Sequence, residues 1–268
     1  MDQVLCAHFG DNTRKGANGM NAIPNPERTV TDIHMHLIPG VDDGAEDLEM
    51  ALVMILRAHS QGITKIFATP HSSAFHRSPE GVRQRFQQLA QAAAVVCPEM
   101  RLYPGCEVYC ETGILDQVLE SLNSGRYPTM NGTSYVLMEF SQWVYPDRTL
   151  PCVEALVKAG YVPIIAHMER YQYLRDSMEL VDRFRGLGAR IQVNAYSLFD
   201  ETDDSIKGWA RRLVLERKVD FLGTDAHRTY HRPPSAAYGL NWLYENTDPE
   251  YADAIARKNA QLFLMASE

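Results

Sequence analysis

A chain of 268 residues can form one large domain or two small ones, and its 45% hydrophobic and 22% charged residues are ordinary for a globular protein. The net charge of -8 argues against general binding to a nucleic-acid backbone, which requires a basic surface, but leaves room for a local basic pocket that holds a small anion. Five scattered cysteines without a Cys-x-x-Cys pair favour a reducing cytoplasm over a disulfide framework. No stretch has the pattern of a transmembrane helix or a signal peptide, so we expect neither membrane insertion nor export.

Residues 1–28 are rich in Asn, Gly and Pro and show no apolar period, which predicts a flexible N-terminal extension before one domain at 29–268. From Thr29 onward, short apolar runs typical of strands alternate with segments whose apolar residues recur at helical spacing. The predicted strands span 29–36, 63–69, 102–109, 135–140, 162–166, 189–194 and 219–223. The predicted helices span 46–61, 79–96, 114–122, 150–159, 178–187, 205–218, 235–245 and 249–264.

This alternation predicts a parallel α/β barrel that is closed or nearly closed. Short strands separated by helices are typical of a parallel sheet, and no repeat, linker or low-complexity block interrupts the pattern. In such a barrel the carboxyl ends of the strands meet at one face, where barrel active sites form. The residues that end the predicted strands are therefore the candidates for chemistry.

Two histidines one residue apart, His34 and His36, end the first predicted strand. Residues i and i+2 of a strand point to the same face, so the two imidazoles should lie side by side. Neutral imidazole is the commonest metal ligand in proteins. Taken alone, the pair could equally be a chance feature of a solvated turn, so the other strand ends must decide between these interpretations.

His, Asp or Glu side chains also follow most of the other predicted strands. Each one alone could be an ordinary loop or capping residue, but carboxylates and imidazoles that converge without a cation would be costly to bury. The candidate ligands are His34, His36, Asp43, His71, Glu107, Glu139, His167, Asp225 and His227. This set of nitrogen and oxygen donors exceeds the needs of one catalytic zinc, so it indicates two or three divalent ions, with Mn preferred and Fe or Zn as alternatives. Clustered metal ions favour the hydrolysis of phosphate esters.

Two arginines lie close in sequence to these candidates. Arg170 lies three residues after His167, and Arg232 lies five residues after His227. Guanidinium groups bind phosphate bidentately and stabilise charge on its equatorial oxygens. A cysteine nucleophile is unlikely to serve instead, because no cysteine has an arginine six residues later, and Walker, Rossmann and Gly-x-Ser-x-Gly motifs are also missing from the sequence.

Taken in order, these motifs resemble the PHP (polymerase and histidinol phosphatase) superfamily. The motifs are Asp32-Ile33-His34-Met35-His36, Asp42-Asp43-Gly44, Thr69-Pro70-His71, Gly105-Cys106-Glu107, Glu139-Phe140-Ser141, His167-Met168-Glu169-Arg170 and Asp225-Ala226-His227. The segments 127–131 and 232–234 resemble its bacterial tyrosine-phosphatase branch, which is associated with capsule and exopolysaccharide synthesis. The resemblance extends over about 29–264, and the N-terminal extension departs from the family pattern.

The resemblance implies a distorted (β/α)₇ TIM-like barrel with three metal ions. One ion would take His34, His36, Glu107 and Asp225, a second would share Glu107 and add Glu139 and His167, and a third would take Asp43, His71 and His227. Arg170, Arg232 and His227 are the implied catalytic residues, and the two arginines would also hold the phosphate. A metal-bridging hydroxide would attack phosphorus directly, and the implied substrate is phosphotyrosine on the tail of a cognate bacterial tyrosine kinase.

Two other functions stay open at this point. A small-molecule phosphatase, such as one acting on histidinol phosphate, would use nearly the same chemistry and differ only at the rim of the pocket. A non-catalytic scaffold could instead use the metals structurally and bind a kinase tail, although the complete ligand set and both arginines argue against this reading.

Overall fold

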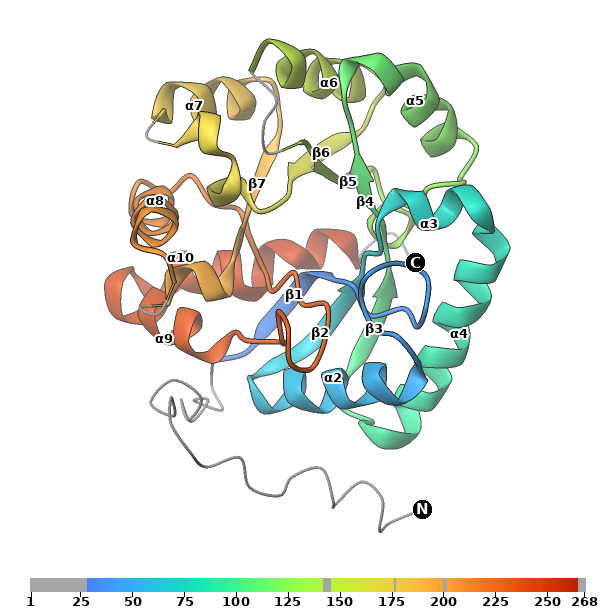
Figure 1. The fold of residues 1–268 in the computed structure, drawn as a ribbon. Helices are drawn as coiled ribbons and strands as arrows, with labels where there is room; N and C mark the ends of the chain where they lie inside the picture. The colour runs from blue at the N-terminus through green and yellow to red at the C-terminus, as the bar shows by residue number, and fades with distance from the viewer. Residues whose placement is uncertain (1–27, 142–145, 176, 200–201, 265–268) are drawn as a thin grey trace.

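Parallel strands ringed by helices build the structure, a computed structural model that describes residues 28–141, 146–175, 177–199 and 202–264 (Figure 1). Except for Arg28, the predicted extension at 1–28 lies outside the described residues. The strands are β1 (Val30–Met35), β2 (Ile63–Ala68), β3 (Arg101–Pro104), β4 (Glu107–Tyr109), β5 (Tyr135–Glu139), β6 (Val162–Ile165), β7 (Arg190–Asn194) and β8 (Phe221–Gly223). The helices are α2 (Leu48–Ser60), α3 (Ser72–Arg77), α4 (Pro79–Val96), α5 (Leu115–Asn123), α6 (Pro146–Lys158), α7 (Met178–Gly186), α8 (Asp204–Leu215), α9 (Ala237–Asn246) and α10 (Pro249–Asp253).

The strands form two parallel sheets that meet at both edges. Their orders are β1-β2-β3 and β4-β5-β6-β7-β8. Single parallel bridges join Met35 to Ala226 at one junction and His71 to Glu107 at the other. The predicted barrel is therefore nearly closed, and both junctions lie beside candidate ligands.

The third predicted strand, 102–109, is not continuous. Its first half is β3, which pairs with β2, and its second half is β4, which pairs with β5. Between them, a side chain on Gly105 would place its Cβ 2.9 Å from Thr69 Cγ2 and 3.2 Å from Met130 Sδ, so only glycine fits this close approach. The break changes the partner strand, and it puts Glu107 at the start of a strand rather than near the end of one.

Capping residues explain why the predicted bounds of α4 are confirmed and those of α2 lie within two residues of the observed ones. The Asp47 side chain accepts a hydrogen bond of 2.8 Å from the Met50 N–H at the start of α2, and Gly62, with φ of 86°, follows its end. Ser78 caps α4 in the same way, and Pro79 occupies the first turn of that helix. None of the helices within the described ranges combines the length and the apolar character that crossing a membrane requires.

Several helical segments differ from the prediction, and α6, for example, begins at Pro146 rather than at 150. The short helix α3 follows His71 directly and was not expected from the sequence. The segment predicted as one helix over 249–264 is helical from Pro249 to Phe263, but its hydrogen-bonding pattern changes along its length. It begins as α10, continues as a π turn at Ala254–Lys258 and ends as a 3₁₀ turn at Asn259–Phe263.

This C-terminal segment closes the amino end of the barrel. The Phe263 ring lies 5.3 Å from Phe67 of β2, 5.0 Å from Tyr135 of β5 and 5.0 Å from Phe221 of β8, measured between ring centroids. Tyr135 and Phe221 are the first residues of their strands. The apolar interior is thus sealed at one end, which leaves the carboxyl ends of the strands as the open face.

Candidate metal centre

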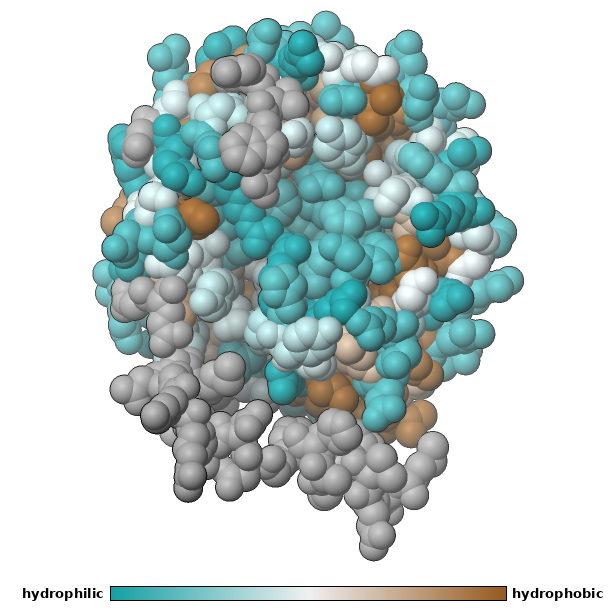
Figure 2. All heavy atoms as spheres, viewed as in Figure 1, coloured by the Kyte–Doolittle hydropathy of each residue, from teal (hydrophilic) through white to brown (hydrophobic). Residues whose placement is uncertain are grey.

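All nine predicted ligands gather at the carboxyl end of the barrel. They come from β1, β4 and β5 and from the segments that follow β1, β2, β6 and β8. Figure 2, seen from the same side as Figure 1, shows hydrophilic residues across the middle of this face. The residues are His34, His36, Asp43, His71, Glu107, Glu139, His167, Asp225 and His227, and each lies within 4 Å of at least one other member, as measured between charged atoms.

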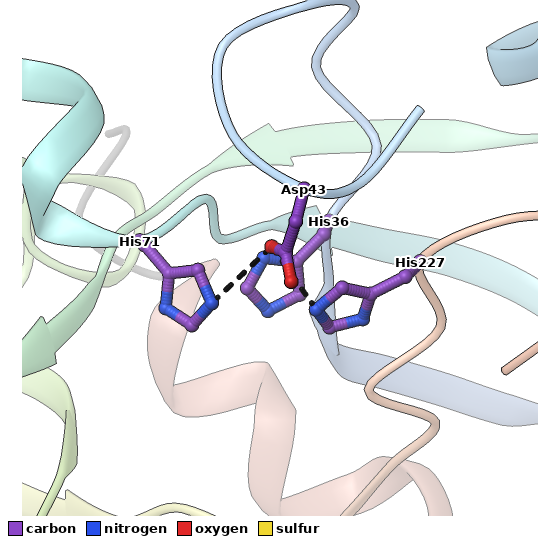
Figure 3. Close-up of side chains that lie close together, drawn as sticks. All are labelled: His36, Asp43, His71 and His227. Atoms are coloured by element: carbon purple, nitrogen blue, oxygen red, sulfur yellow. Dashed lines mark ion pairs between the residues drawn. The ribbon is translucent and has the colours of Figure 1, made fainter. Parts of the chain in front are cut away.

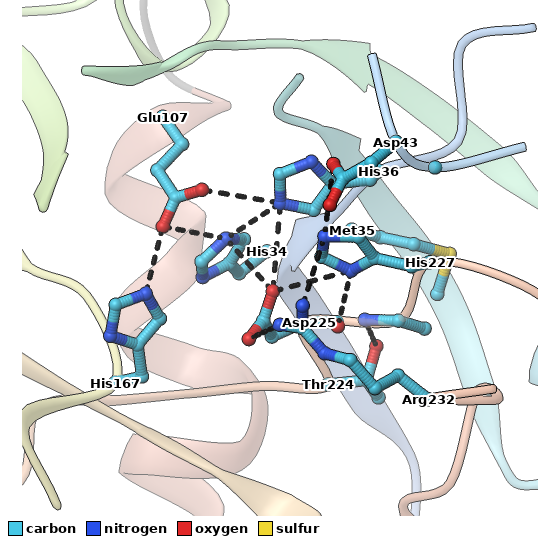
Figure 4. Close-up of polar contacts among 12 residues, drawn as sticks. His34, Met35, His36, Asp43, Glu107, His167, Thr224, Asp225, His227 and Arg232 are labelled. Carbon is cyan, nitrogen blue, oxygen red and sulfur yellow. Dashed lines mark hydrogen bonds and ion pairs between the residues drawn. The ribbon is translucent and has the colours of Figure 1, made fainter. Parts of the chain in front are cut away.

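The carboxylate of Glu107 is the centre of the inner part of this cluster (Figure 4). Its Oε1 atom lies 3.2 Å from His34 Nε2 and 2.9 Å from His167 Nε2. Its Oε2 atom lies 3.2 Å from His36 Nε2 and 3.1 Å from His71 Nδ1. Only 1% of the Glu107 side chain is exposed. One buried carboxylate therefore faces four imidazoles.

A second group consists of His36, Asp43, His71 and His227, whose side chains lie close together in Figure 3. Asp43 Oδ1 lies 3.4 Å from His71 Nε2 and 3.4 Å from His227 Nε2, and the Asp43 side chain is 64% exposed. The His36 ring stacks on the His227 ring with 3.9 Å between centroids. Glu139 Oε1 lies 3.1 Å from His71 Nδ1. His36 and His71 therefore connect the inner group with the outer one.

Three residues that were not predicted as site residues hold the histidines in place. Asp42 Oδ2 lies 2.8 Å from His36 Nδ1. Gln192 Oε1 lies 3.3 Å from His34 Nδ1 and accepts a hydrogen bond of 2.8 Å from the His167 N–H. Asp32 Oδ1 accepts one of 3.1 Å from the His34 N–H. Such contacts fix the orientation of a ligand ring and are typical of metal centres.

The raised pKa values of His36 and His71 reflect the negative charge of the carboxylates that surround them. Burial works against a charged imidazole, yet the carboxylates of Asp42 and Glu107 raise the pKa of His36 to about 10. Against the same opposing effect of burial, Glu107 and Glu139 raise the pKa of His71 to about 11. Without a cation, protons on these rings balance the carboxylates, and a divalent ion would take over that role by displacing them.

The donor set fits divalent metal ions. Three groups, each with ligand atoms within 4.8 Å of one another, lie in the cluster: His36, Asp43, His71 and His227; His34, His36 and Glu107; and His71, Glu107 and Glu139. All their donors are imidazole nitrogens or carboxylate oxygens, which suit Mn, Fe or Zn. Burial, and then the positive charges of His36 and Arg232, lower the pKa of His227 to about 3, so this ring is neutral and can bind a metal.

Both predicted arginines reach the cluster through Asp225. Arg170 Nη1 and Arg232 Nη2 each form an ion pair with Asp225 Oδ2, and Arg232 Nη1 lies 3.1 Å from His227 Nε2. The backbone φ angles of Asp225, Arg232 and His167 are 55°, 53° and 35°. Residues other than glycine rarely adopt positive φ angles. Strained backbone of this kind is concentrated at functional sites.

A pocket of about 230 Å³ lies beside the cluster. Its lining residues are Asp43, His227, Arg228, Tyr230, His231 and Arg232. The pocket therefore shares two candidate ligands and one predicted phosphate-binding arginine with the cluster, and the exposed Tyr230 ring stands on its rim. A small anionic group that enters here would reach two of the candidate ligands, Asp43 and His227.

Two known proteins that are similar to this chain in sequence are tyrosine phosphatases. Tyrosine-protein phosphatase YwqE of Bacillus subtilis is 31% identical over 203 residues, which cover 75% of this chain and 78% of YwqE. Tyrosine-protein phosphatase CpsB of Streptococcus pneumoniae is 29% identical over 240 residues, which cover 87% of this chain and 94% of CpsB.

Structural similarity gives the same grouping. A chain from the crystal structures of YwqE from Bacillus subtilis and CpsB from Streptococcus pneumoniae, described as unique metal-dependent tyrosine phosphatases, matches with a TM-score of 0.80 and 29% identity over 89% of this chain and 95% of that one. The phosphotriesterase homology protein of Escherichia coli, at 12% identity and a TM-score of 0.53, shares the fold alone. These matches confirm the predicted α/β barrel. The family model for capsular polysaccharide synthesis CpsB/CapC proteins matches residues 30–265, and the chain therefore belongs to the CpsB/CapC family, as its resemblance to the tyrosine-phosphatase branch of the PHP superfamily implied.

Proposed function

We propose that this chain is a metal-dependent protein-tyrosine phosphatase, a phosphoric monoester hydrolase that releases phosphate from phosphotyrosine. The observation that carries the proposal is Glu107, whose buried carboxylate lies within 3.2 Å of a ring nitrogen of each of four histidines. A cage for cations beside two guanidinium groups suits phosphate-ester hydrolysis, because both stabilise charge on the phosphoryl oxygens. The activity named for YwqE and CpsB supports phosphotyrosine as the substrate.

Two or three divalent ions, with Mn preferred, would occupy the cage. The assignment we favour gives one ion His34, His36, Glu107 and Asp225, a second Glu107, Glu139 and His167, and a third Asp43, His71 and His227. Glu107 belongs to two of the three groups of close ligand atoms, which supports a cage in which two neighbouring ions share this carboxylate. Mixed imidazole and carboxylate donors support Mn, Fe or Zn over Mg or Ca.

When bound, the ions would activate a water for direct attack on phosphorus and neutralise charge on the phosphoryl oxygens. The residues of the chain would position the substrate. Arg170 and Arg232 pair with Asp225 in the structure, and engagement of that carboxylate by a cation would free both guanidinium groups to bind phosphate. His227, kept neutral by its lowered pKa, would complete the catalytic set beside Arg232.

The rest of the substrate would lie on the exposed rim of the pocket. Tyr230 is 71% exposed and shares the pocket with His227 and Arg232, so its ring could lie against the phenyl ring of phosphotyrosine. The open rim suits an extended segment such as the tail of a bacterial tyrosine kinase.

The four described cysteines are free and buried, which supports a cytoplasmic location where thiols stay reduced.

The decisive experiment compares phosphate release from a phosphotyrosine peptide by protein reloaded with Mn²⁺ and by protein stripped with a chelator. We expect release only from the metal-loaded sample. Release that survives complete removal of metal would contradict the mechanism. Faster turnover of histidinol phosphate than of the peptide would favour a small-molecule phosphatase, and peptide binding without release under any metal would favour a scaffold.

The arginines provide a second test of the same proposal. Replacing Arg232 with lysine keeps the charge but removes the bidentate fork, so we expect kcat/KM on the peptide to fall by about 100-fold or more. The matched control is Arg183→Lys on the exposed surface of α7, which should leave the rate unchanged. Equal rates for the Arg232 variant and the control would remove Arg232 from the proposed phosphate site.

A further inference from the structure

Three potential metal ligands of different types meet at the opposite end of the barrel from the centre described above. His59 lies in the last turn of α2, Cys97 directly follows α4, and Glu99 lies two residues further on. One ligand atom from each side chain lies within 4.8 Å of the others. Because these residues precede β2 and β3, the group lies at the amino ends of the strands and shares no residue with the nine-residue cluster.

The donors in this group suit one particular kind of ion. An imidazole nitrogen, a thiolate sulfur and a carboxylate oxygen are the three ligand types that Zn²⁺ accepts, and three protein ligands leave its fourth position to water. Cys97 is 3% exposed, whereas His59 and Glu99 are exposed, so the sulfur is sheltered while solvent can deliver the ion. No other described residue forms an ion pair or hydrogen bond with the His59 ring or the Glu99 carboxylate.

The surrounding backbone also favours a cation here. Both α2 and α4 end at the group, and the C-terminal end of a helix carries the partial negative charge of the helix dipole. The nearby Arg101 guanidinium donates to the carbonyl oxygens of Pro98 and Met100, so it leaves the Glu99 carboxylate available. A sulfur donor, an available carboxylate and the negative ends of two helix dipoles thus meet where α2 and α4 end.

We propose that His59, Cys97 and Glu99 form a separate site for one Zn²⁺ ion. On binding, the Cys97 thiol loses its proton to solvent and the sulfur bonds to the metal as a thiolate, with water as the fourth ligand. The α2 and α4 helices pack against each other on the outside of the barrel (Figure 1), and the ion would join their C-terminal ends. The site shares no residue with the nine-residue cluster, so ion binding here would be independent of phosphate hydrolysis.

Cobalt is the probe that separates this site from the main centre. Co²⁺ bound to a thiolate absorbs in the near ultraviolet through sulfur-to-metal charge transfer, and Co²⁺ held by nitrogen and oxygen alone does not. We would titrate Co²⁺ into the full-length protein already loaded with Mn²⁺. We expect a thiolate band that saturates at the absorbance of one thiolate-bound Co²⁺ per chain, whatever Co²⁺ exchanges into the main centre, and that disappears when Zn²⁺ is added.

Variants assign the band to the three residues. Cys97→Ser should abolish it, and the matched control Cys152→Ser, at another buried free cysteine, should retain it. His59→Asn and Glu99→Gln alter exposed side chains, so they should fold normally, keep full phosphatase activity and weaken Co²⁺ binding by about tenfold or more. The proposal is wrong if no thiolate band appears, if the band survives Cys97→Ser, or if His59→Asn and Glu99→Gln bind Co²⁺ as tightly as the parent protein.

Discussion

At the scale of single residues, the His36 ring is held from both sides. Its Nδ1 atom lies 2.8 Å from Asp42 Oδ2, and its Nε2 atom lies 3.2 Å from Glu107 Oε2. Asp42 also accepts hydrogen bonds from the N–H groups of Gly44 and His71, at 3.0 Å each. One carboxylate therefore orients a ligand ring and the backbone of two neighbouring segments.

Replacing Asp42 with asparagine should weaken metal binding. The amide cannot supply the negative charge that holds the His36 ring, so we expect the affinity for the bound ions to fall by about 10- to 100-fold. Competition with a chromophoric chelator would measure this change. The control is Glu49→Gln, an exposed carboxylate in the first turn of α2. An unchanged affinity in the Asp42 variant would show that Asp42 does not support the centre.

Individual residues also show which parts of the candidate site could be predicted from the sequence and which could not. His36, His71 and His167 follow apolar strands, so their approach to one another follows from the rule that parallel strands end at one face. Gln192 lies in β7, the one strand whose predicted end carried no His, Asp or Glu. Its amide bonds to His34 and to the His167 backbone, and nothing in the sequence distinguishes it from any other buried glutamine.

At the scale of secondary-structure elements, the break between β3 and β4 positions the central carboxylate. The Glu107 N–H donates a hydrogen bond of 3.0 Å to the Pro70 carbonyl, and His71 is bridged to Glu107. An uninterrupted strand would keep pairing with β2 and would carry Glu107 past the end of that partner. The sequence predicted one strand because its apolar pattern continues through the break, and only tertiary contacts at Gly105 reveal it.

Gly105→Ala should damage both stability and the centre. The added Cβ would lie 2.9 Å from Thr69 Cγ2, so the break must shift and take Glu107 with it. We expect a loss of about 1–3 kcal/mol in the free energy of unfolding together with weaker metal binding, measured by urea denaturation and chelator competition. The control Gly208→Ala, in α8, meets nothing within 4 Å and should leave stability equal or slightly higher. Tight metal binding in the Gly105 variant would contradict this account of the break.

At the scale of the whole molecule, the cluster couples protonation to folding. In metal-free protein the pKa of His36 is raised to about 10 and that of His71 to about 11, both above the ordinary value of 6.5. Their contribution to stability is fully present below about pH 6.5 and is lost as the pH rises through the folded-state values. The pKa of His227 is lowered to about 3, so its contribution is present above about pH 6.5 and is lost as the pH falls toward 3.

We therefore expect the metal-stripped protein to lose stability as the pH rises from about 7 to 10, because His36 and His71 give up their protons while the buried carboxylates stay charged. Metal-loaded protein should lose much less over the same range, since the ions replace those protons. Urea unfolding of both samples at a series of pH values measures the difference. Parallel stability curves for the two samples would contradict the coupling.

The separation in sequence between contacting residues sets the order in which the molecule can be completed. The Asp225 N–H donates a hydrogen bond of 2.7 Å to the His34 carbonyl, and Phe263 packs against the opening strand residues of β5 and β8. Contacts between residues this far apart in the sequence make folding slow, because the entropy of closing a long loop is lost before the stabilising contact forms. On the ribosome, the first histidine pair must wait for almost the entire polypeptide to emerge. Metal loading is therefore a late event, and a truncated or stalled chain would carry its histidines without the cage that retains the ions.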